Sequence, residues 1–180
     1  NDQTNDIYES GILGIENSSI TSLSDLDTLM LISKQITTHP NFAALIVALF
    51  QEAELSKGDT IAVSMTGSFP GANIALLSAC KAMNIYPVII SSMGASMWGA
   101  TEPEFTWIDM ENILYKEKIF DQISIAYSLG GKGDCLRKSK DDEGREIFDK
   151  KIKKYNAQQI SYSTSDMNNL YKSINQRILL

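Results

Sequence analysis

The sequence predicts an α/β fold, namely a Rossmann-like three-layer sandwich with a mainly parallel sheet of about four strands and helices on both faces. Short apolar runs alternate along the chain with amphipathic segments of helical length. Each segment between two runs is long enough for a helical crossover, which is how parallel strands are joined. The runs at 60–65 and 86–91 are almost continuously apolar, as is typical of strands covered on both faces.

Taken in order, residues 1–22 are polar and are expected to form an N-terminal arm with little regular structure, and residues 23–180 a single α/β domain. A first helix is expected to begin at Ser24, where Asp27 completes an acidic capping box, and to end before Pro40. Asn41 is a suitable cap for a second helix. Its buried stripe is expected at Phe42, Leu45, Ile46, Leu49 and Ala53.

Strands and helices alternate over the rest of the chain. The strands are expected at 60–65, 86–91, 122–128 and about 158–162. The helices are expected at 72–83, 106–118, 142–155 and 165–178. Because the strands run parallel, the loops that follow them should emerge on one edge of the sheet, where open α/β sheets bind their ligands.

The composition excludes several classes of function. The net charge of −6 argues against a nucleic-acid partner, and the lysines at 150, 151, 153 and 154 are interpreted as the solvated face of a helix. Two cysteines and one histidine give no disulfide framework and no common zinc site. Cys80, in a helical pattern, is expected to be buried. We expect no metal and no cofactor.

The loop after the first strand carries two glycines and two hydroxyls at the start of a helix. Thr66, Gly67 and Ser68 therefore suit a carboxylate or phosphate, bound by hydroxyls and by free amides of the helix N-terminus. A tight turn with incidental hydroxyls explains the same residues. A nucleophilic role for Ser68 would need a base, and the only histidine is His39.

Two later loops offer further candidates. The long connection from 91 to 109 contains Glu104, which has no obvious capping role and is the better functional carboxylate. Asp109, three residues after Thr106, is better explained as part of a capping box. In the third loop, 128–134, three glycines and Lys132 suit an anion, although a flexible glycine loop has the same composition.

Several strings in these loops resemble one family. They are Asn41-Phe42-Ala43-Ala44-Leu45, Gly67-Ser68-Phe69-Pro70-Gly71-Ala72-Asn73, residues 91–98, Glu102-Pro103-Glu104-Phe105-Thr106-Trp107, Asp109-Met110-Glu111 and Ser128-Leu129-Gly130-Gly131. The chain is similar in them to the bacterial poly-gamma-glutamate system protein family, which accompanies capsule-type synthesis of poly-γ-glutamate. The resemblance covers roughly residues 10 to 175 and is specific over 59–134. Lys132 and residues 135–137 stand where the family has more glycine.

The resemblance implies a cellular location and no particular mechanism. It implies a domain on the extracytoplasmic face of the bacterial cell envelope, following an N-terminal membrane anchor absent from this chain, which begins with Asn1. No run of about 18 apolar residues is present in the chain itself. The implied partners are poly-γ-glutamate or the proteins of its synthesis complex, and no catalytic residue is implied.

Three hypotheses follow. The leading one is an accessory protein that binds an anionic γ-glutamyl ligand or partner at the sheet edge. Its expected ligand-binding residues are Thr66, Gly67, Ser68, Asn73, Ser92, Glu104, Gly130 and Gly131. The second is a γ-glutamyl amide hydrolase or transferase that uses Ser68, or Glu104 with Asp109. The third is a structural protein that docks on the membrane synthetase through Trp98 and its loop.

Overall fold

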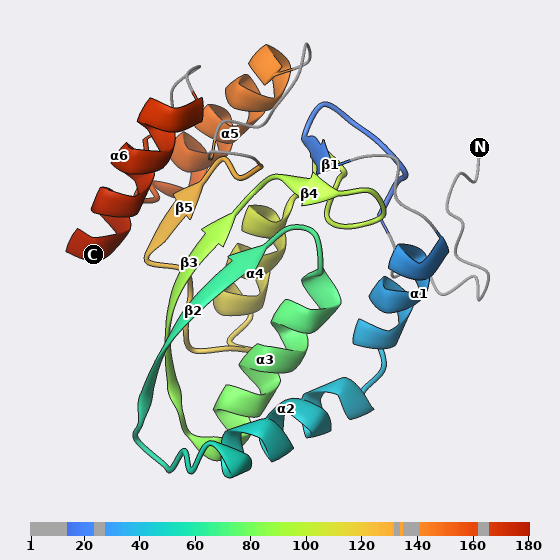
Figure 1. Cartoon of the computed structure of the whole chain (residues 1–180), viewed down its shortest axis with the longest axis vertical. Coiled ribbons are helices and arrows are strands. Elements are labelled where there is room, and N and C mark those ends of the chain that lie inside the picture. The colour runs from blue at the N-terminus through green and yellow to red at the C-terminus, as the bar shows by residue number, and fades with distance from the viewer. Residues whose placement is uncertain (1–13, 24–27, 132–133, 135–140, 162–165) are drawn as a thin grey trace.

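The computed structural model describes residues 14–23, 28–131, 134, 141–161 and 166–180. It shows an α/β sandwich built on parallel strands, which confirms the predicted fold class (Figure 1). The main sheet has the order β2-β3-β5, with β2 at Thr60–Thr66, β3 at Tyr86–Ser92 and β5 at Ala126–Ser128. The strands are fewer than predicted, because the segment expected at 158–162 contributes only an isolated parallel bridge between Gln159 and Tyr127.

A second, two-stranded sheet was not predicted. Strand β1, Thr21–Leu23, pairs in parallel with β4, Ala95–Ser96. Ile20, just before β1, is fully buried, and the Gly14 amide donates to the Trp98 carbonyl at 3.2 Å. The expectation of little regular structure through residue 22 is therefore wrong for the last residues of this segment, which lie against the loop after β3.

Six helices surround the strands in the part of the chain that the structure describes. They are α1 (Thr28–Thr37), α2 (Asn41–Glu52), α3 (Pro70–Met83), α4 (Trp107–Lys116), α5 (Asp141–Tyr155) and α6 (Asp166–Leu179). The expected start of α1 at Ser24 and its capping residue Asp27 lie outside the described residues. The other predicted helices are present, and α3 starts with Pro70 in its first turn, where a missing amide proton costs nothing.

Helix α2 differs from the prediction in two ways. Asn41 is its first residue rather than its cap, and Pro40 occupies the cap position. The helix has no buried residue, and Leu45 and Leu49 of the predicted buried stripe are each about half exposed. The reason is its position, since α2 lies at one end of the molecule and packs on α3 (Figure 1).

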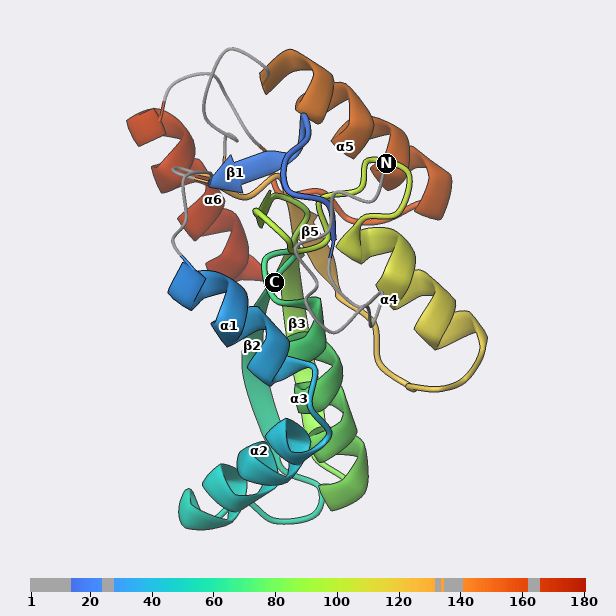
Figure 2. The same ribbon diagram turned by 90° about the vertical axis from the view of Figure 1, so that its right-hand side faces the viewer.

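The two faces of the main sheet are covered unequally. Met65 and Ile89 pack with Leu77 of α3 and Trp107 of α4 in one core cluster. Helix α6 lies on the opposite side of the sheet from α4 (Figure 2). This second face is covered only in part, since Tyr86 remains 59% exposed. The apolar character of β3 therefore does not mean complete burial on both faces.

Candidate ligand-binding site

The C-terminal ends of the three parallel strands meet at one edge, as predicted. Thr66 of β2 is in register with Ser92 of β3, which is in register with Ser128 of β5. Side chains of a strand alternate between its faces, so these three residues share the face on the α6 side. The edge therefore carries a row of hydroxyl residues.

A pocket of about 150 Å³ opens at this edge. We call it the serine pocket, because its lining includes Ser64, Ser91, Ser92 and Ser128. Gly130, Gly131, Asp134 and Arg177 also line it. Three predicted ligand residues, Ser92, Gly130 and Gly131, thus lie together here, and Arg177 reaches the pocket from α6.

Glycine is required at position 130 of this pocket. Gly130 has a φ of +80°, a region that side chains with a Cβ rarely adopt. A Cβ there would lie 2.9 Å from the Cβ of Ser92 and 3.3 Å from the Gly94 amide nitrogen. The loop after β5 can therefore approach the end of β3 closely only because this residue has no side chain.

The hydroxyl of Ser128 is the most informative group in the pocket. Ser128 is 1% exposed, and its Oγ has no hydrogen-bond partner among the described residues. An unsatisfied buried hydroxyl costs about 1–3 kcal/mol, so most buried polar groups are paired. A group left unpaired beside a cavity indicates a position that a ligand can fill.

An ion pair supplies the charges of the pocket. Arg177 Nη1 lies 2.6 Å from Asp134 Oδ2, and the side chains are 29% and 14% exposed. The guanidinium has five N–H donors in a fixed fork, so one contact leaves others available. Neither residue was singled out from the sequence, since Arg177 belongs to a distant amphipathic helix.

The turn between β2 and α3 is filled by the chain itself. A Cβ on Gly67 would lie 2.6 Å from the Met93 carbonyl oxygen, and the Ala100 amide donates to the Gly67 carbonyl at 2.7 Å. Asn73 Nδ2 donates to the Thr66 carbonyl at 2.9 Å. The small residues predicted as a ligand cradle here instead let the loop after β4 pack against the turn.

A buried lysine lies beside this turn. Lys34 of α1 is 2% exposed, and its ammonium donates to the Ser68 carbonyl and, at 2.9 Å, to Ser96 Oγ. It also lies 4.2 Å from the centre of the Phe69 ring. Burial lowers the pKa of Lys34 to about 8. A lone lysine in a helical stripe gives no sequence signal for such a position.

The hydroxyl of Ser68 has neighbours among the described residues, but none of them is a base. Its Oγ accepts from the Ser96 amide at 3.0 Å and lies 3.2 Å from Thr66 Oγ1. His39, the expected partner, is exposed and accepts from the Asn41 amide. The structure therefore does not bring Ser68 and His39 together.

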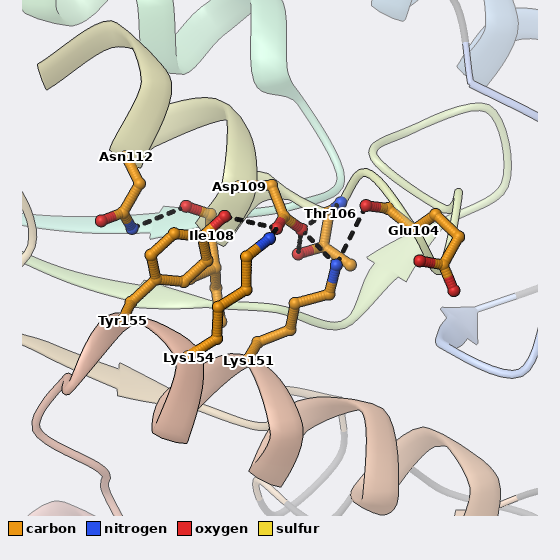
Figure 3. A network of polar contacts seen from close by, with 8 residues as sticks. All are labelled: Glu104, Thr106, Ile108, Asp109, Asn112, Lys151, Lys154 and Tyr155. Atoms are coloured by element: carbon orange, nitrogen blue, oxygen red, sulfur yellow. Dashed lines mark hydrogen bonds and ion pairs between the residues drawn. The ribbon is translucent and has the colours of Figure 1, made fainter. Parts of the chain in front are cut away.

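Asp109 is a cap and an ion-pair centre (Figure 3). Its Oδ2 accepts from the Thr106 amide at 3.0 Å and from the Thr106 hydroxyl at 2.8 Å, which confirms the capping box. Lys151 of α5 lies 2.7 Å away, and Tyr155 donates to Oδ1 at 2.7 Å. Burial would raise the pKa of Asp109, but these bonds and one from Lys154 outweigh it and lower the pKa to about 2. A carboxylate held this way is a poor proton acceptor.

The same contacts correct the interpretation of one residue of the lysine run. Lys151 is 8% exposed and docks α5 on α4, so it does not belong to a solvated face. Lys150, Lys153 and Lys154 are exposed as expected, and Lys154 also pairs with Asp109 at 3.1 Å. Lys151 also donates to the Glu104 backbone carbonyl at 3.0 Å. The carboxylate of Glu104 points away from this cluster (Figure 3), and Glu104 is exposed and does not line the serine pocket.

A second buried carboxylate, Glu111, was not predicted. It accepts from the Ser124 amide and hydroxyl and, at 2.5 Å, from the Tyr127 hydroxyl. Burial raises the pKa of Glu111 despite these bonds. They tie α4 to β5, so this group holds the sheet to its helical layer. Cys80 is buried, as expected.

Trp98 is also placed differently from the docking hypothesis. It is 6% exposed and packs with Leu31 and Met97 in a small core cluster. Its φ of +57° is unusual for a large residue. The indole is therefore part of the interior and does not form an exposed contact surface.

Comparison with known proteins adds no assignment. No protein-family model, curated protein or solved structure matches this chain. In the described ranges, no helix is long and apolar enough to cross a membrane. The same residues contain no group of three or more His, Cys, Asp or Glu that could hold a metal ion.

Proposed function

We propose that this chain is a binding protein for γ-glutamyl carboxylates, acting beside the poly-γ-glutamate synthesis proteins at the extracytoplasmic face of the bacterial envelope. The observation that carries the proposal is the Ser128 hydroxyl, which has no hydrogen-bond partner among the described residues and lines, together with Arg177, a pocket at the ligand-binding edge of the sheet. Arginine and hydroxyl groups together suit a carboxylate, which accepts several hydrogen bonds at once. The resemblance of the surrounding loops supports the polymer as the source of that carboxylate.

Binding is favoured over catalysis by the environment of each catalytic candidate. In the part of the chain that the structure describes, no base contacts the Ser68 hydroxyl, and Asp109 is an ionised cap. Glu104 is exposed with its carboxylate directed away from the other candidates (Figure 3). None of these groups lines the serine pocket. A ligand bound there would meet hydroxyls and one ion pair but no poised nucleophile.

The proposal is tested by incubating the chain with poly-γ-glutamate and following both polymer length and co-elution by size-exclusion chromatography. We expect co-elution without shortening, and loss of co-elution in Arg177→Gln and Ser128→Ala. Lys172→Gln is the matched control, because it removes one positive charge from an exposed position of the same helix. Co-elution that survives in both pocket variants would contradict the assignment of the site.

One observation favours a second candidate, an amide hydrolase. The Lys34 amine lies 2.9 Å from Ser96 Oγ and has a pKa lowered to about 8, as a general base for a serine nucleophile requires. Against it, Lys34 and Ser96 are 2% and 3% exposed, which leaves a polymer no route to them in this conformation. Shortening of the polymer that is lost in Lys34→Met and Ser96→Ala, but kept in Arg177→Gln, would establish this candidate instead.

A further inference from the structure

The charges in the serine pocket do not suit a simple anion. Arg177 and Asp134 are the charged residues of its described lining, and they are already paired at 2.6 Å. A ligand with carboxylates alone would gain the guanidinium but would also approach the Asp134 carboxylate. Like charges at such distances repel, and the repulsion is stronger in a partly buried site than in water. The pocket therefore calls for a ligand that also carries positive charge.

We infer that the serine pocket binds an amino-acid head group, that is, an ammonium and a carboxylate on one carbon atom. The Arg177 fork donates to the carboxylate, and Asp134 accepts from the ammonium. The two charges of the ligand lie as close together as the two charges of the protein pair. Ser128 contributes a hydroxyl that no described residue engages, and it can donate to the carboxylate or accept from the ammonium.

The size of the pocket supports a head group over a length of polymer. Its volume of about 150 Å³ is small beside the roughly 300–1,000 Å³ of sites that hold larger ligands. The loop at Gly130 packs closely against the Ser92 side chain and the Gly94 amide, where not even a Cβ could be added without a shift. One residue fits such a space, and neighbouring residues of a chain would extend into solvent.

This inference rests on the proposed function for the identity of the polymer, and it makes that function more specific. In a γ-linked glutamyl chain, only the amino-terminal residue keeps a free ammonium beside its α-carboxylate. The nitrogen of every later residue is an uncharged amide. The domain would therefore recognise the amino-terminal chain end, or free glutamate, and not the interior of the polymer.

The test compares ligands that differ in the ammonium group or in the configuration of the carbon atom that carries it. Isothermal titration of the full chain with L-glutamate, D-glutamate, glutarate and N-acetyl-L-glutamate gives the four affinities. We expect one glutamate enantiomer to bind at least about tenfold more tightly than glutarate or the N-acetyl compound, since a charge-assisted hydrogen bond is lost in both. Asp134→Asn should weaken glutamate binding and strengthen glutarate binding, which removes the preference.

Asp142→Asn is the control, because Asp142 is paired with an arginine but is almost fully exposed on α5. It should leave all four affinities unchanged, and circular dichroism checks that each variant is folded. Equal binding of glutamate and glutarate, unaffected by Asp134→Asn but lost in Arg177→Gln, would overturn the head-group inference while leaving carboxylate binding in place. No binding of any of the four ligands, and no co-elution of the polymer, would overturn both.

Discussion

Asp109 is the single residue on which most polar contacts between α4 and α5 converge. Its side chain is 3% exposed, and five donor atoms point at it, two from Thr106 at the start of α4 and one each from Lys151, Lys154 and Tyr155 of α5. The paired carboxylate is more stable in the ionised form than a free one, because its pKa falls from 3.8 to about 2. Such a difference corresponds to about 2 kcal/mol of folding free energy at neutral pH.

The first prediction follows from this pKa. Because the folded value lies below the unfolded one, the stabilisation is complete above about pH 5 and is lost as the pH falls through about 2. Asp109→Asn should lower the free energy of unfolding at pH 7 by about 3 kcal/mol, since it also leaves Lys151 buried without its partner. Urea denaturation at pH 7 and at a series of lower pH values measures both effects.

Asp142→Asn provides the comparison, because its ion pair with Arg145 lies at the surface, where such pairs contribute little. Its stability should change much less than that of Asp109→Asn, with the acid sensitivity of the wild type retained. If Asp109→Asn unfolded at the same urea concentration as the wild type at pH 7, the ion-pair cluster would be dispensable. Asp109 would then have to be reconsidered as a functional carboxylate.

The residues also show what a sequence can and cannot reveal about a site. The capping role of Asp109 was predictable, because T-x-x-D is a local pattern that needs no knowledge of distant segments. The roles of Lys34, Asp134 and Arg177 could not be predicted from the sequence, because each depends on a partner far away in the chain. Gly130 falls between these cases, since its loop was identified locally but its contact with Ser92 depends on strand register.

At the scale of elements, the loop after β4 packs tightly between α1 and the turn that leads into α3. Gly99 is at the tightest point of this contact. A Cβ there would lie 2.6 Å from the Gly67 carbonyl oxygen and 2.8 Å from that of Ser68. Both are backbone atoms, which cannot move away as the end of a flexible side chain can.

The second prediction concerns this contact. Gly99→Ala should lower the free energy of unfolding by about 3 kcal/mol, which is the upper part of the range for adding atoms to a packed interior. Gly58→Ala is a useful comparison, since a Cβ there meets nothing within 4 Å and only the positive φ of +93° opposes it. Its cost should be about 1 kcal/mol. Similar losses of unfolding free energy in the two variants would show that the loop after β4 can relax around an extra methyl group.

The elements that were predicted well are those with long periodic patterns. Strands β2 and β3 and helices α3 to α6 were located close to their observed bounds. The two short strands were not located. Strands β1 and β4 contain three and two residues, which is too short for any alternation to be recognised. The buried stripe of α2 failed for a different reason. A helical pattern shows that a face is apolar, but not whether another element covers it.

For the molecule as a whole, the decisive property is the sign of its charge. The net charge is −6, and the proposed ligand is a polyanion. Long-range attraction therefore cannot bring the two together, and any affinity must come from contacts confined to the serine pocket. Salt acts on the distant repulsion much more than on the partly buried contacts with Arg177, because a Debye length is about 30 Å at 0.01 M salt and about 8 Å at 0.15 M.

The third prediction follows from this difference between long-range repulsion and short-range contacts in the pocket. Raising the salt concentration from 0.01 M to 0.15 M should tighten the binding of poly-γ-glutamate by about threefold, because the repulsion between the two polyanions is screened. Binding of free glutamate, which carries little net charge, should change less than the binding of the polymer. Titration of both ligands across the salt series measures the two slopes on the same protein.

A basic binding surface would give the opposite result, with affinity for the polymer falling steeply as salt rises. That outcome would move the polymer from the serine pocket to the exposed lysines of α5, where Lys150 and Lys153 are available, and Lys150→Gln with Lys153→Gln would then abolish the slope.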